Sequence, residues 1–341
     1  MKAAIFSEHG GPEVIRVAEV ATPEPGPGEV RIRVRAAAMN HLDLWTRRGL
    51  PIEIIMPHIG GSDIAGEVDA VGPGAEWVPP GLRVVVDPSL DYDWYEGRPQ
   101  GPSLPNPALR LIGEHTQGGF AEYAVVPAKN LLELPDDVPF DIAAAAGLVG
   151  VTAWRGLMVR GGLRAGESVL VTGASGGVST MAIQIARMVG AEVFAVTSGP
   201  DNVERARALG AHRVYDRHAG DFGKALWKDT GKRGVDVVLD SVGQGLWPAL
   251  LRALAPCGRL VTFGATTGAL GETEIRLVFW RQLSILGSTM GSPAEFREVM
   301  GHVFAGRLGP VISDVLPLEE VASAHRRLEA GEVFGKLVIR P

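Results

Sequence analysis

The stretch from residue 168 to residue 190, SVLVTGASGGVSTMAIQIARMVG, constrains the fold of this chain more than any other. Residues 169–171 are an apolar run that predicts a buried strand, and the small residues 173–177 predict a tight turn. Apolar residues then recur at helical spacing, and residues 193–196 form a second apolar run. The pattern therefore predicts a βαβ unit, in which the N–H groups at the start of the helix face a phosphate.

The glycine motif is incomplete. The strict pattern GxGxxG falls on Ala174, Gly176 and Ser179, so only the middle glycine is present. A tight turn in another α/β fold is the alternative interpretation, but the surrounding βαβ unit is the context that a dinucleotide motif needs. We therefore favour a dinucleotide site. The expected phosphate contacts are Gly173, Ala174, Ser175, Gly176, Gly177 and Val178.

Composition excludes several classes of function. The chain has 341 residues, 46% of them apolar, and a net charge of −6 with no basic block, so it is long enough for two domains and nucleic acid is not an expected partner. No stretch approaches the 18 uninterrupted apolar residues typical of a membrane span, so we expect no membrane partner. The single cysteine, Cys257, makes a reducing cytoplasm the simplest location.

Two styles of pattern divide the chain. Before residue 125, short β runs separated by glycines predict a small β domain, with Val30, Ile32 and Val34 alternating with arginines. After it, strands expected at 169–172, 193–197, 213–215, 235–240, 259–263 and 284–287 alternate with helices. This order predicts a six-stranded, doubly wound parallel sheet. We expect residues 1–124 and 288–341 to form one domain and residues 125–287 the other. Ligands lie at the carboxyl ends of such strands, so the expected border of the crevice is Asp240, Ser241, Phe263, Gly264 and Ala265.

Several motifs resemble the medium-chain dehydrogenase/reductase superfamily over nearly the whole chain. They are GGPEV near the N-terminus, NHLDLWTRRG at 40–49, AGEVDAVGPG at 65–74, GGFAEYAVVP at 118–127, TGASGGV at 172–178 and the closing GKLVI. The resemblance implies a GroES-like β-barrel catalytic domain beside a Rossmann dinucleotide-binding domain.

The positions of the metal ligands narrow the resemblance. Zinc dehydrogenases of the superfamily carry a cysteine where this chain has Asn40, a histidine–glutamate pair where it has Ser62 and Asp63, and a further ligand near Leu148. Asn40, Ser62 and Leu148 are poor zinc ligands, so we expect no zinc. The pattern resembles the zinc-independent quinone oxidoreductase branch. The four-cysteine lobe of the zinc enzymes aligns with residues 87–114, where Tyr92 and Tyr95 stand roughly at the first two cysteine positions.

The resemblance also implies the roles of the catalytic residues. Asn40 is the expected hydrogen-bond donor to the acceptor carbonyl, and Thr152 matches a position beside the nicotinamide. Asp43 either orients Asn40 or the ribose, or is a charge at a helix N-terminus. Enoyl reductases of the superfamily use an early tyrosine as proton donor, but no tyrosine precedes Tyr92 here. The sequence therefore identifies no proton donor.

The choice of cofactor depends on the end of the second strand. An NAD site usually has an acid about 20 residues after the glycine turn, but this chain has Thr197 and Ser198 there. These hydroxyls, with charge from Arg217, suit a 2′-phosphate, so we favour NADP and leave NAD open. Ser288 and Lys336 are further expected cofactor contacts, the latter at the pyrophosphate or else as a solvated lysine on a strand.

Three functions remain open at this point. The favoured one is a zinc-independent NADPH-dependent reductase of quinones or enones, acting on a small molecule; the others are an alcohol dehydrogenase and a nucleotide-binding protein with little catalysis. The apolar last strand, at residues 284–287, predicts an uncovered sheet edge, and hence a homodimer or a homotetramer.

Overall fold

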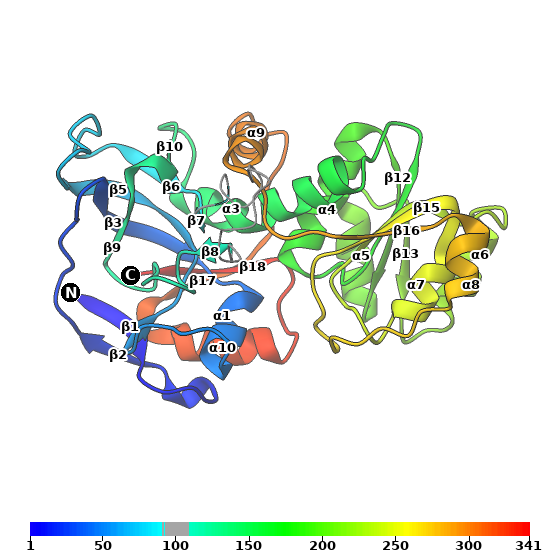
Figure 1. The fold of residues 1–341 in the computed structure, drawn as a ribbon, viewed down its shortest axis with the longest axis horizontal. Coiled ribbons are helices and arrows are strands. Elements are labelled where there is room, and N and C mark those ends of the chain that lie inside the picture. The colour runs from blue at the N-terminus through cyan, green and yellow to red at the C-terminus, as the bar shows by residue number, and fades with distance from the viewer. Residues whose placement is uncertain (91, 93–108) are drawn as a thin grey trace, which may run out of the picture. The chain divides into compact units, whose positions relative to one another are not determined.

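The computed structural model describes residues 1–90, 92 and 109–341. They form two compact units, Met1–Leu148 with Gly291–Pro341, and Val149–Met290 (Figure 1). The sequence places boundaries after residues 124 and 287, whereas this division falls after Leu148 and Met290. Strand β9 (Tyr123–Pro127) pairs with β3 (Glu29–Ala38), which keeps the segment after residue 124 in the first unit.

The first unit is built on strand β3. Its apolar residues Val30, Ile32 and Val34 are buried while Arg33 and Arg35 are exposed, so the alternation of the sequence sets which face meets the core. Among the described residues, β3 belongs to a seven-stranded sheet of order β10-β6-β5-β3-β18-β17, with β9 also paired to β3. The other strands of this sheet are β5 (Asp63–Val71), β6 (Arg83–Val86), β10 (Leu131–Glu133), β17 (Ile312–Pro317) and β18 (Lys336–Arg340).

Smaller elements complete the first unit. Strands β1 (Lys2–Phe6), β2 (Arg16–Glu19) and β4 (His58–Ile59) form a second sheet, and β7 (Ser89–Leu90) pairs with β8 (Arg110–Leu111). The helices are α1 (His41–Arg48), the first part of α3 (Phe140–Trp154), α9 (Pro293–Phe304) and α10 (Val321–Glu329). Because β18 pairs with both β3 and β17, the C-terminal segment is part of the same sheet as the N-terminal strands.

The second unit confirms the predicted six-stranded parallel sheet. Its order is β13-β12-β11-β14-β15-β16, the strand order of a doubly wound fold. The strands are β11 (Ser168–Val171), β12 (Glu192–Thr197), β13 (Arg213–Asp216), β14 (Val235–Asp240), β15 (Leu254–Thr262) and β16 (Ser284–Gly287). Strand β15 starts at Leu254, earlier than the predicted start at residue 259. The sequence Pro-Cys-Gly at residues 256–258 is typical of a turn, but it lies within the strand. Cys257 there has φ of 63°, and the pairing with β14 is irregular.

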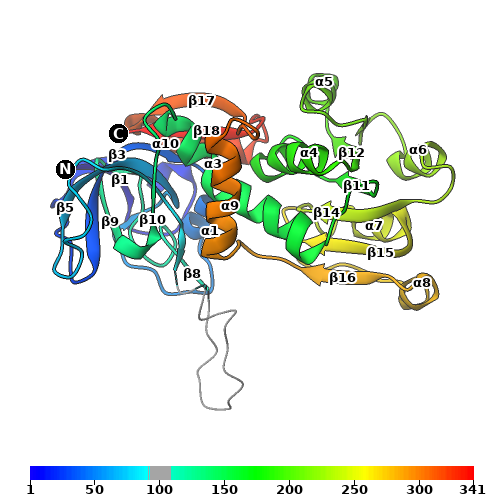
Figure 2. The same cartoon turned by 90° about the horizontal axis from the view of Figure 1, so that it is seen from above.

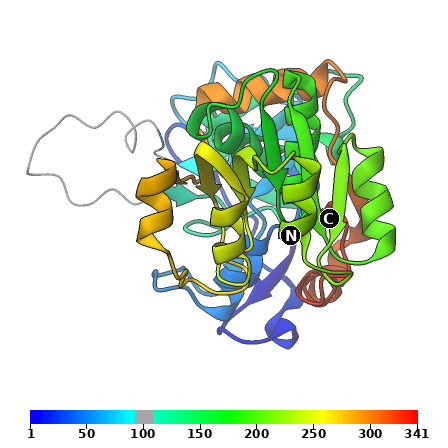
Figure 3. The same cartoon turned by 90° about the vertical axis from the view of Figure 1, so that its right-hand side faces the viewer.

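Helices cover both faces of this sheet. Helices α4 (Gly177–Val189) and α5 (Pro200–Ala208) lie on one face, and α6 (Phe222–Asp229), α7 (Trp247–Ala253) and α8 (Ile275–Arg281) lie on the other (Figures 1 and 3). A core cluster that includes Leu170, Phe194, Leu226 and Leu250 fills the space beneath the second set. Apolar residues of α4, among them Met181, Ile183 and Ile185, are buried, so its apolar spacing serves packing, while its N-terminus follows the carboxyl end of β11.

One helical stretch is long and apolar enough to cross a membrane by length and composition alone. It runs over Phe140–Arg160, as α3 followed by a wider helical turn, and 78% of its apolar window is buried within the structure. The core helix of a globular protein meets the same criteria.

Candidate functional site

Three buried polar side chains meet in the first unit. Lys336 Nζ donates to Asn40 Oδ1 at 2.5 Å and to Asp63 Oδ2 at 3.0 Å, and Asn40 Nδ2 donates to the same Asp63 oxygen at 2.9 Å. Lys336 is 3% exposed and Asp63 1%. We call Asn40, Asp63 and Lys336 the polar triad. Strand β3 leads into Asn40, β5 starts at Asp63 and β18 starts at Lys336, so the pairing of three strands assembles it.

The contacts within the polar triad bear on the roles predicted for Asn40 and Lys336. Both N–H groups of the Asn40 amide are used, one by Asp63 and one by Ala38 O at 3.3 Å, so donation to an acceptor carbonyl requires Asn40 to release a partner. Lys336 is neither a solvated lysine nor free of partners, because burial and the ion pair hold it against Asp63. Its predicted contact with a pyrophosphate stays a prediction.

Asp43 fixes the backbone around the triad. Its carboxylate accepts the N–H of Asn40 at 2.7 Å and that of Gly61 at 2.8 Å, so it joins the start of α1 to the segment before Asp63. Burial raises the pKa of Asp43 to about 6, although the two backbone N–H groups and Lys336 act in the opposite direction. This geometry is what an orienter of Asn40 requires, and it also matches an acid in the first turn of a helix.

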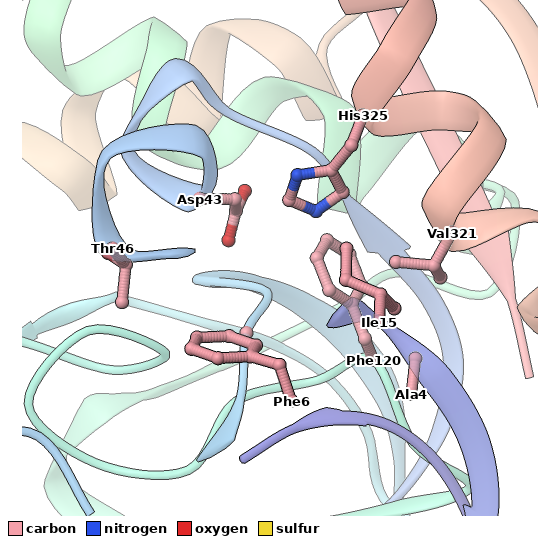
Figure 4. Close-up of a pocket in the computed structure, with 9 residues that line it drawn as sticks. Ala4, Phe6, Ile15, Asp43, Thr46, Phe120, Val321 and His325 are labelled. Carbon is pink, nitrogen blue, oxygen red and sulfur yellow. The ribbon is translucent and has the colours of Figure 1, made fainter. Parts of the chain in front are cut away.

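A small cavity lies behind Asp43. Asp43 and His325 face each other across it, between the apolar side chains Phe6, Ile15 and Phe120 (Figure 4). Burial and the neighbouring Arg47 lower the pKa of His325 to about 3, so its ring is neutral. The cavity volume is about 10 Å³, which is room for one water and not for a quinone.

The positions that resemble zinc ligands do not fit zinc. Asn40 and Asp63 are occupied by each other and by an ammonium group, Ser62 offers a hydroxyl and Leu148 an alkyl chain. The Ser62 Oγ is buried and has no partner among the described residues. Within residues 1–90, 92 and 109–341, no group of three or more His, Cys, Asp or Glu side chains is placed to hold a metal. The predicted alignment of Tyr95 with a cysteine of the structural lobe lies outside the described residues.

The glycine turn of the second unit fits a dinucleotide. Gly173 has φ of 55°, a conformation that favours glycine, and a Cβ there would lie 3.0 Å from Ser241 Oγ. Gly176 caps α4 without a side-chain hydrogen bond, so the N–H groups of the first helical turn remain for a phosphate. Gly173, Ala174, Ser175 and Gly176 lie in this turn, and Gly177 and Val178 are the first two residues of α4.

The other expected cofactor contacts gather at the same edge of the sheet. All six strands are parallel, so their carboxyl ends share one edge. Asp240 is held there by Thr172 Oγ1 at 2.7 Å and by the N–H groups of Val242 and Gly243, each at 3.0 Å. The sequence-predicted residues directly after the strand ends are Ser198, Arg217, Ser241, Phe263, Gly264, Ala265 and Ser288.

Two orphaned hydroxyls lie along this edge. Thr197 Oγ1 and Ser288 Oγ are buried and have no partner among the described residues, which suits a polar ligand. The backbone N–H of Arg217 donates to Thr197 O at 3.0 Å, so the backbone of Arg217 lies beside the end of β12. The side chain of Arg217 is exposed. The carboxylate of Asp216 accepts the N–H of His218 at 2.9 Å, and this bond lowers the pKa of Asp216.

Thr152 belongs to the second unit, as the glycine turn does. It is buried on α3, and its hydroxyl lies 3.9 Å from Met290 Sδ.

The hydrogen bonds of Asp63 were not predicted from the sequence. Its carboxylate accepts from Lys336 Nζ and from the N–H of Leu148, the latter at 2.7 Å to Oδ1. Sequence reasoning also missed the Thr172–Asp240 bond, for which the polar residues at the ends of two apolar runs were the available signal.

Two family profiles match the chain. The one described as "Alcohol dehydrogenase GroES-like domain" covers residues 26–136, and the one described as "Zinc-binding dehydrogenase" covers residues 177–305. The quinone oxidoreductase of Pseudomonas aeruginosa is 31% identical, over 98% of this chain and 98% of that protein. The chain belongs to the medium-chain dehydrogenase/reductase superfamily, in its quinone oxidoreductase-like branch. It is an oxidoreductase of that superfamily.

Other relatives extend the range of chemistry in the family. The crotonyl-CoA reductase of Streptomyces collinus is 31% identical over 96% of this chain and 82% of that protein. A solved structure named NAD-dependent alcohol dehydrogenase is 42% identical, with a TM-score of 0.93 and full coverage of both chains. A crotonyl-CoA carboxylase/reductase solved in complex with NADP has a TM-score of 0.89 at 28% identity, covering 100% of this chain and 94% of that one. The family and this complex support a nicotinamide cofactor.

Proposed function

We propose that this protein reduces quinones or α,β-unsaturated carbonyl compounds with NADPH and without a metal. The observation that carries the proposal is the polar triad, because Asn40, at a position where the resemblance gives zinc relatives a ligand, is bonded to the ammonium of Lys336 and the carboxylate of Asp63. A reduced nicotinamide supplies a hydride when it is bound. Electron-poor acceptors take hydride without a Lewis acid, so the chain has to bind, orient and exclude water.

The cofactor side of the proposal depends on the second unit. The turn 173–178 would hold the pyrophosphate at the N-terminus of α4. Ser198 and Arg217 would hold the 2′-phosphate, because a hydroxyl and a guanidinium are donors that phosphate prefers. The NAD-dependent relative and the nearby carboxylate of Asp216 favour NADH as the alternative.

Turnover by metal-free protein tests the proposal. After dialysis against a chelator, we expect oxidation of NADPH by para-benzoquinone and by cyclohexenone, with no gain from added zinc. Arg217→Ser is expected to weaken NADPH binding about tenfold and NADH binding little, since one charged contact with phosphate is worth about 1.4 kcal/mol. Arg213→Ser, at the start of the strand that Arg217 directly follows, is the control.

The outcome that contradicts the proposal is also defined. Oxidation of alcohols that appears only with added zinc would make the chain an alcohol dehydrogenase, as the names of several solved relatives suggest. A preference for NADH that Arg217→Ser leaves unchanged would overturn the cofactor assignment alone. A cytoplasmic location stays a prediction.

We also propose that the protein is a homodimer joined through the second unit. Strand β16 is the edge strand of the six-stranded sheet, and α8, which precedes it in the chain, lies next to it (Figure 2). Ile275, Phe279 and Trp280 on α8 are exposed, Trp280 at 80%. An unpaired strand edge beside an apolar patch suits pairing with a second copy of the chain.

Light scattering tests the dimer. We expect a mass of about twice 36.1 kDa, and Trp280→Glu is expected to shift it toward the monomer because a charge would enter an apolar contact. Trp77→Glu is the control, since Trp77 is 68% exposed on the first unit. A 36.1 kDa particle at all concentrations would refute the homodimer.

A further inference from the structure

Strands β11 and β14 are neighbours at the point where the order of the six-stranded sheet reverses. From β11 the chain continues outward to β12 and β13, and from β14 it continues in the other direction to β15 and β16. In a doubly wound sheet each half binds one mononucleotide, and the dinucleotide lies across the reversal point. The glycine turn and Arg217 therefore belong to one half of the cofactor site, and the turn after β14 belongs to the other.

A buried hydrogen bond joins the two halves at the carboxyl edge of the sheet. Thr172 directly follows β11 and Asp240 ends β14, and both are 0% exposed. Thr172 Oγ1 donates to Asp240 Oδ1 at 2.7 Å. The same hydroxyl oxygen accepts the N–H of Ser241 at 3.2 Å. Thr172 is thus bonded to the end of β14 both as a donor and as an acceptor.

The carboxylate of Asp240 also shapes the turn that follows β14. It accepts the N–H of Val242 at Oδ1 and that of Gly243 at Oδ2, each at 3.0 Å. Gly243 has φ of 76°, and a Cβ there would lie 2.9 Å from Ala265 Cα, so this turn packs closely against the turn after β15. Burial raises the pKa of Asp240, and its three hydrogen-bond donors act in the opposite direction. Asp240 therefore fixes the backbone that carries the expected cofactor contact Ser241.

Thr172 carries the connection into the glycine turn. Its carbonyl oxygen accepts a hydrogen bond from Ser179 Oγ at 2.7 Å, which ties it to the first turn of α4. Gly173 follows directly, and its Cβ position lies 3.0 Å from Ser241 Oγ. One continuous set of bonds therefore runs from the start of α4 through Thr172 and Asp240 to the turn after β14.

We propose that Thr172 and Asp240 are positioning residues that hold the two halves of the cofactor site in register. The inference deepens the cofactor side of the proposed function and rests on it. Neither residue has to touch the cofactor, because their bond acts on the two turns that carry its expected contacts. A dinucleotide engages both turns at once, so its affinity depends on how well the turns are held relative to each other. A ligand that occupies one half does not have this dependence.

The types of the two residues fit this role. Asparagine at position 240 would keep the shape of the side chain but would offer one acceptor oxygen and one NH2 group. In one orientation the NH2 group faces the N–H of Gly243, and in the other it faces that of Val242, so two donors meet either way. Valine at position 172 would also keep the shape, but it would remove the hydroxyl that Asp240 and Ser241 both use.

The binding of whole and half cofactors tests the proposal. Isothermal titration calorimetry should show that Asp240→Asn and Thr172→Val each bind NADPH about tenfold more weakly than the unaltered protein. Adenosine 2′,5′-bisphosphate carries only the adenosine half, so its affinity should stay within about twofold. Thr172→Ser keeps the hydroxyl and should bind both ligands as the unaltered protein does. NADH with adenosine 5′-diphosphate is the matching pair of ligands if the protein prefers NADH.

The opposite end of the same two strands supplies the matched control. Ser168 Oγ donates to Asp236 Oδ2 at 2.8 Å, and this bond also joins β11 to β14, but at the amino end of β11. Ser168→Ala removes the same kind of bond at the edge opposite the glycine turn, so the affinity for NADPH should stay within about twofold. Thermal unfolding followed by circular dichroism shows whether each variant is folded.

The outcomes separate the role of the pair from the proposed function. An unaltered protein that binds neither NADPH nor NADH refutes the proposed function. If it binds one of them, three results overturn the role of Thr172 and Asp240 alone: equal losses for the whole and the half cofactor, unchanged affinity in both variants, or a loss of the same size in Ser168→Ala. Variants that do not fold would show that the pair supports the whole second unit, which overturns the assigned role as well.

Discussion

Replacing Lys336 with methionine is expected to lower the free energy of unfolding by about 3 to 5 kcal/mol, because it leaves a buried carboxylate without its counter-charge. Asp63 is 1% exposed and has no other cationic partner among the described residues. The change is expected to abolish reductase activity as well, since Asn40 would lose the ammonium that fixes its Oδ1. Denaturant unfolding followed by circular dichroism measures the first effect, and NADPH oxidation the second.

The same strand provides the control. Arg340→Met removes the cation of the Arg340–Asp141 pair, whose arginine side chain is 60% exposed, so we expect a loss of about 1 kcal/mol or less. The double variant Lys336→Met with Asp63→Asn should recover part of the stability, because no buried charge remains. Equal losses for Lys336→Met and Arg340→Met would show that the polar triad is not what holds this part of the first unit.

Replacing Gly173 with valine is expected to weaken cofactor binding by about tenfold or more, equivalent to about 1.4 kcal/mol. The residue has φ of 55°, and a new Cβ would lie 3.0 Å from Ser241 Oγ, so the turn or the end of β14 would shift where the phosphates are expected. Fluorescence titration with NADPH and with NADH measures the effect.

Gly162→Val separates this effect from backbone strain. Gly162 has φ of 54°, and nothing lies within 4 Å of its Cβ position, so the variant carries the same conformational cost without the contact. We expect its affinity for the cofactor to stay within about twofold of the unaltered protein. If both variants lose affinity equally, the turn 173–178 acts through stability and does not contact the cofactor.

Local patterns predicted most of the second unit. The apolar runs in β11, β12 and β14 and the helical spacing in α4 specify their own elements, because burial on one or both faces leaves few alternatives. The parallel, doubly wound character of the sheet followed from the alternation of strands and helices, and the structure gives its strand order. Strand β15 was placed late because Pro256 and Gly258 are typical turn residues, and only its pairing with β14 keeps them within a strand.

Contacts between distant residues were outside the reach of these patterns. Lys336 and Asp63 are 273 positions apart, and no periodicity links a lysine at the start of one strand to an aspartate at the start of another. Glu114 reads as an ordinary acid next to a histidine. Its pKa is raised to about 7 by burial and by the charge of Asp43, neither of which a local pattern shows.

The sequence by itself therefore determined the family, the parallel sheet, the turn that fits a dinucleotide and the lack of zinc-type ligands at Asn40, Ser62 and Leu148. These features are local, because each is encoded by residue type and by spacing within one segment. The tertiary structure decided which partners the polar groups take: the ammonium of Lys336 for Asn40 and Asp63, two backbone N–H groups for Asp43, and His115 for Glu114. Burial and strand pairing set those partners, and the chemistry of a buried polar group depends on its partners more than on its identity.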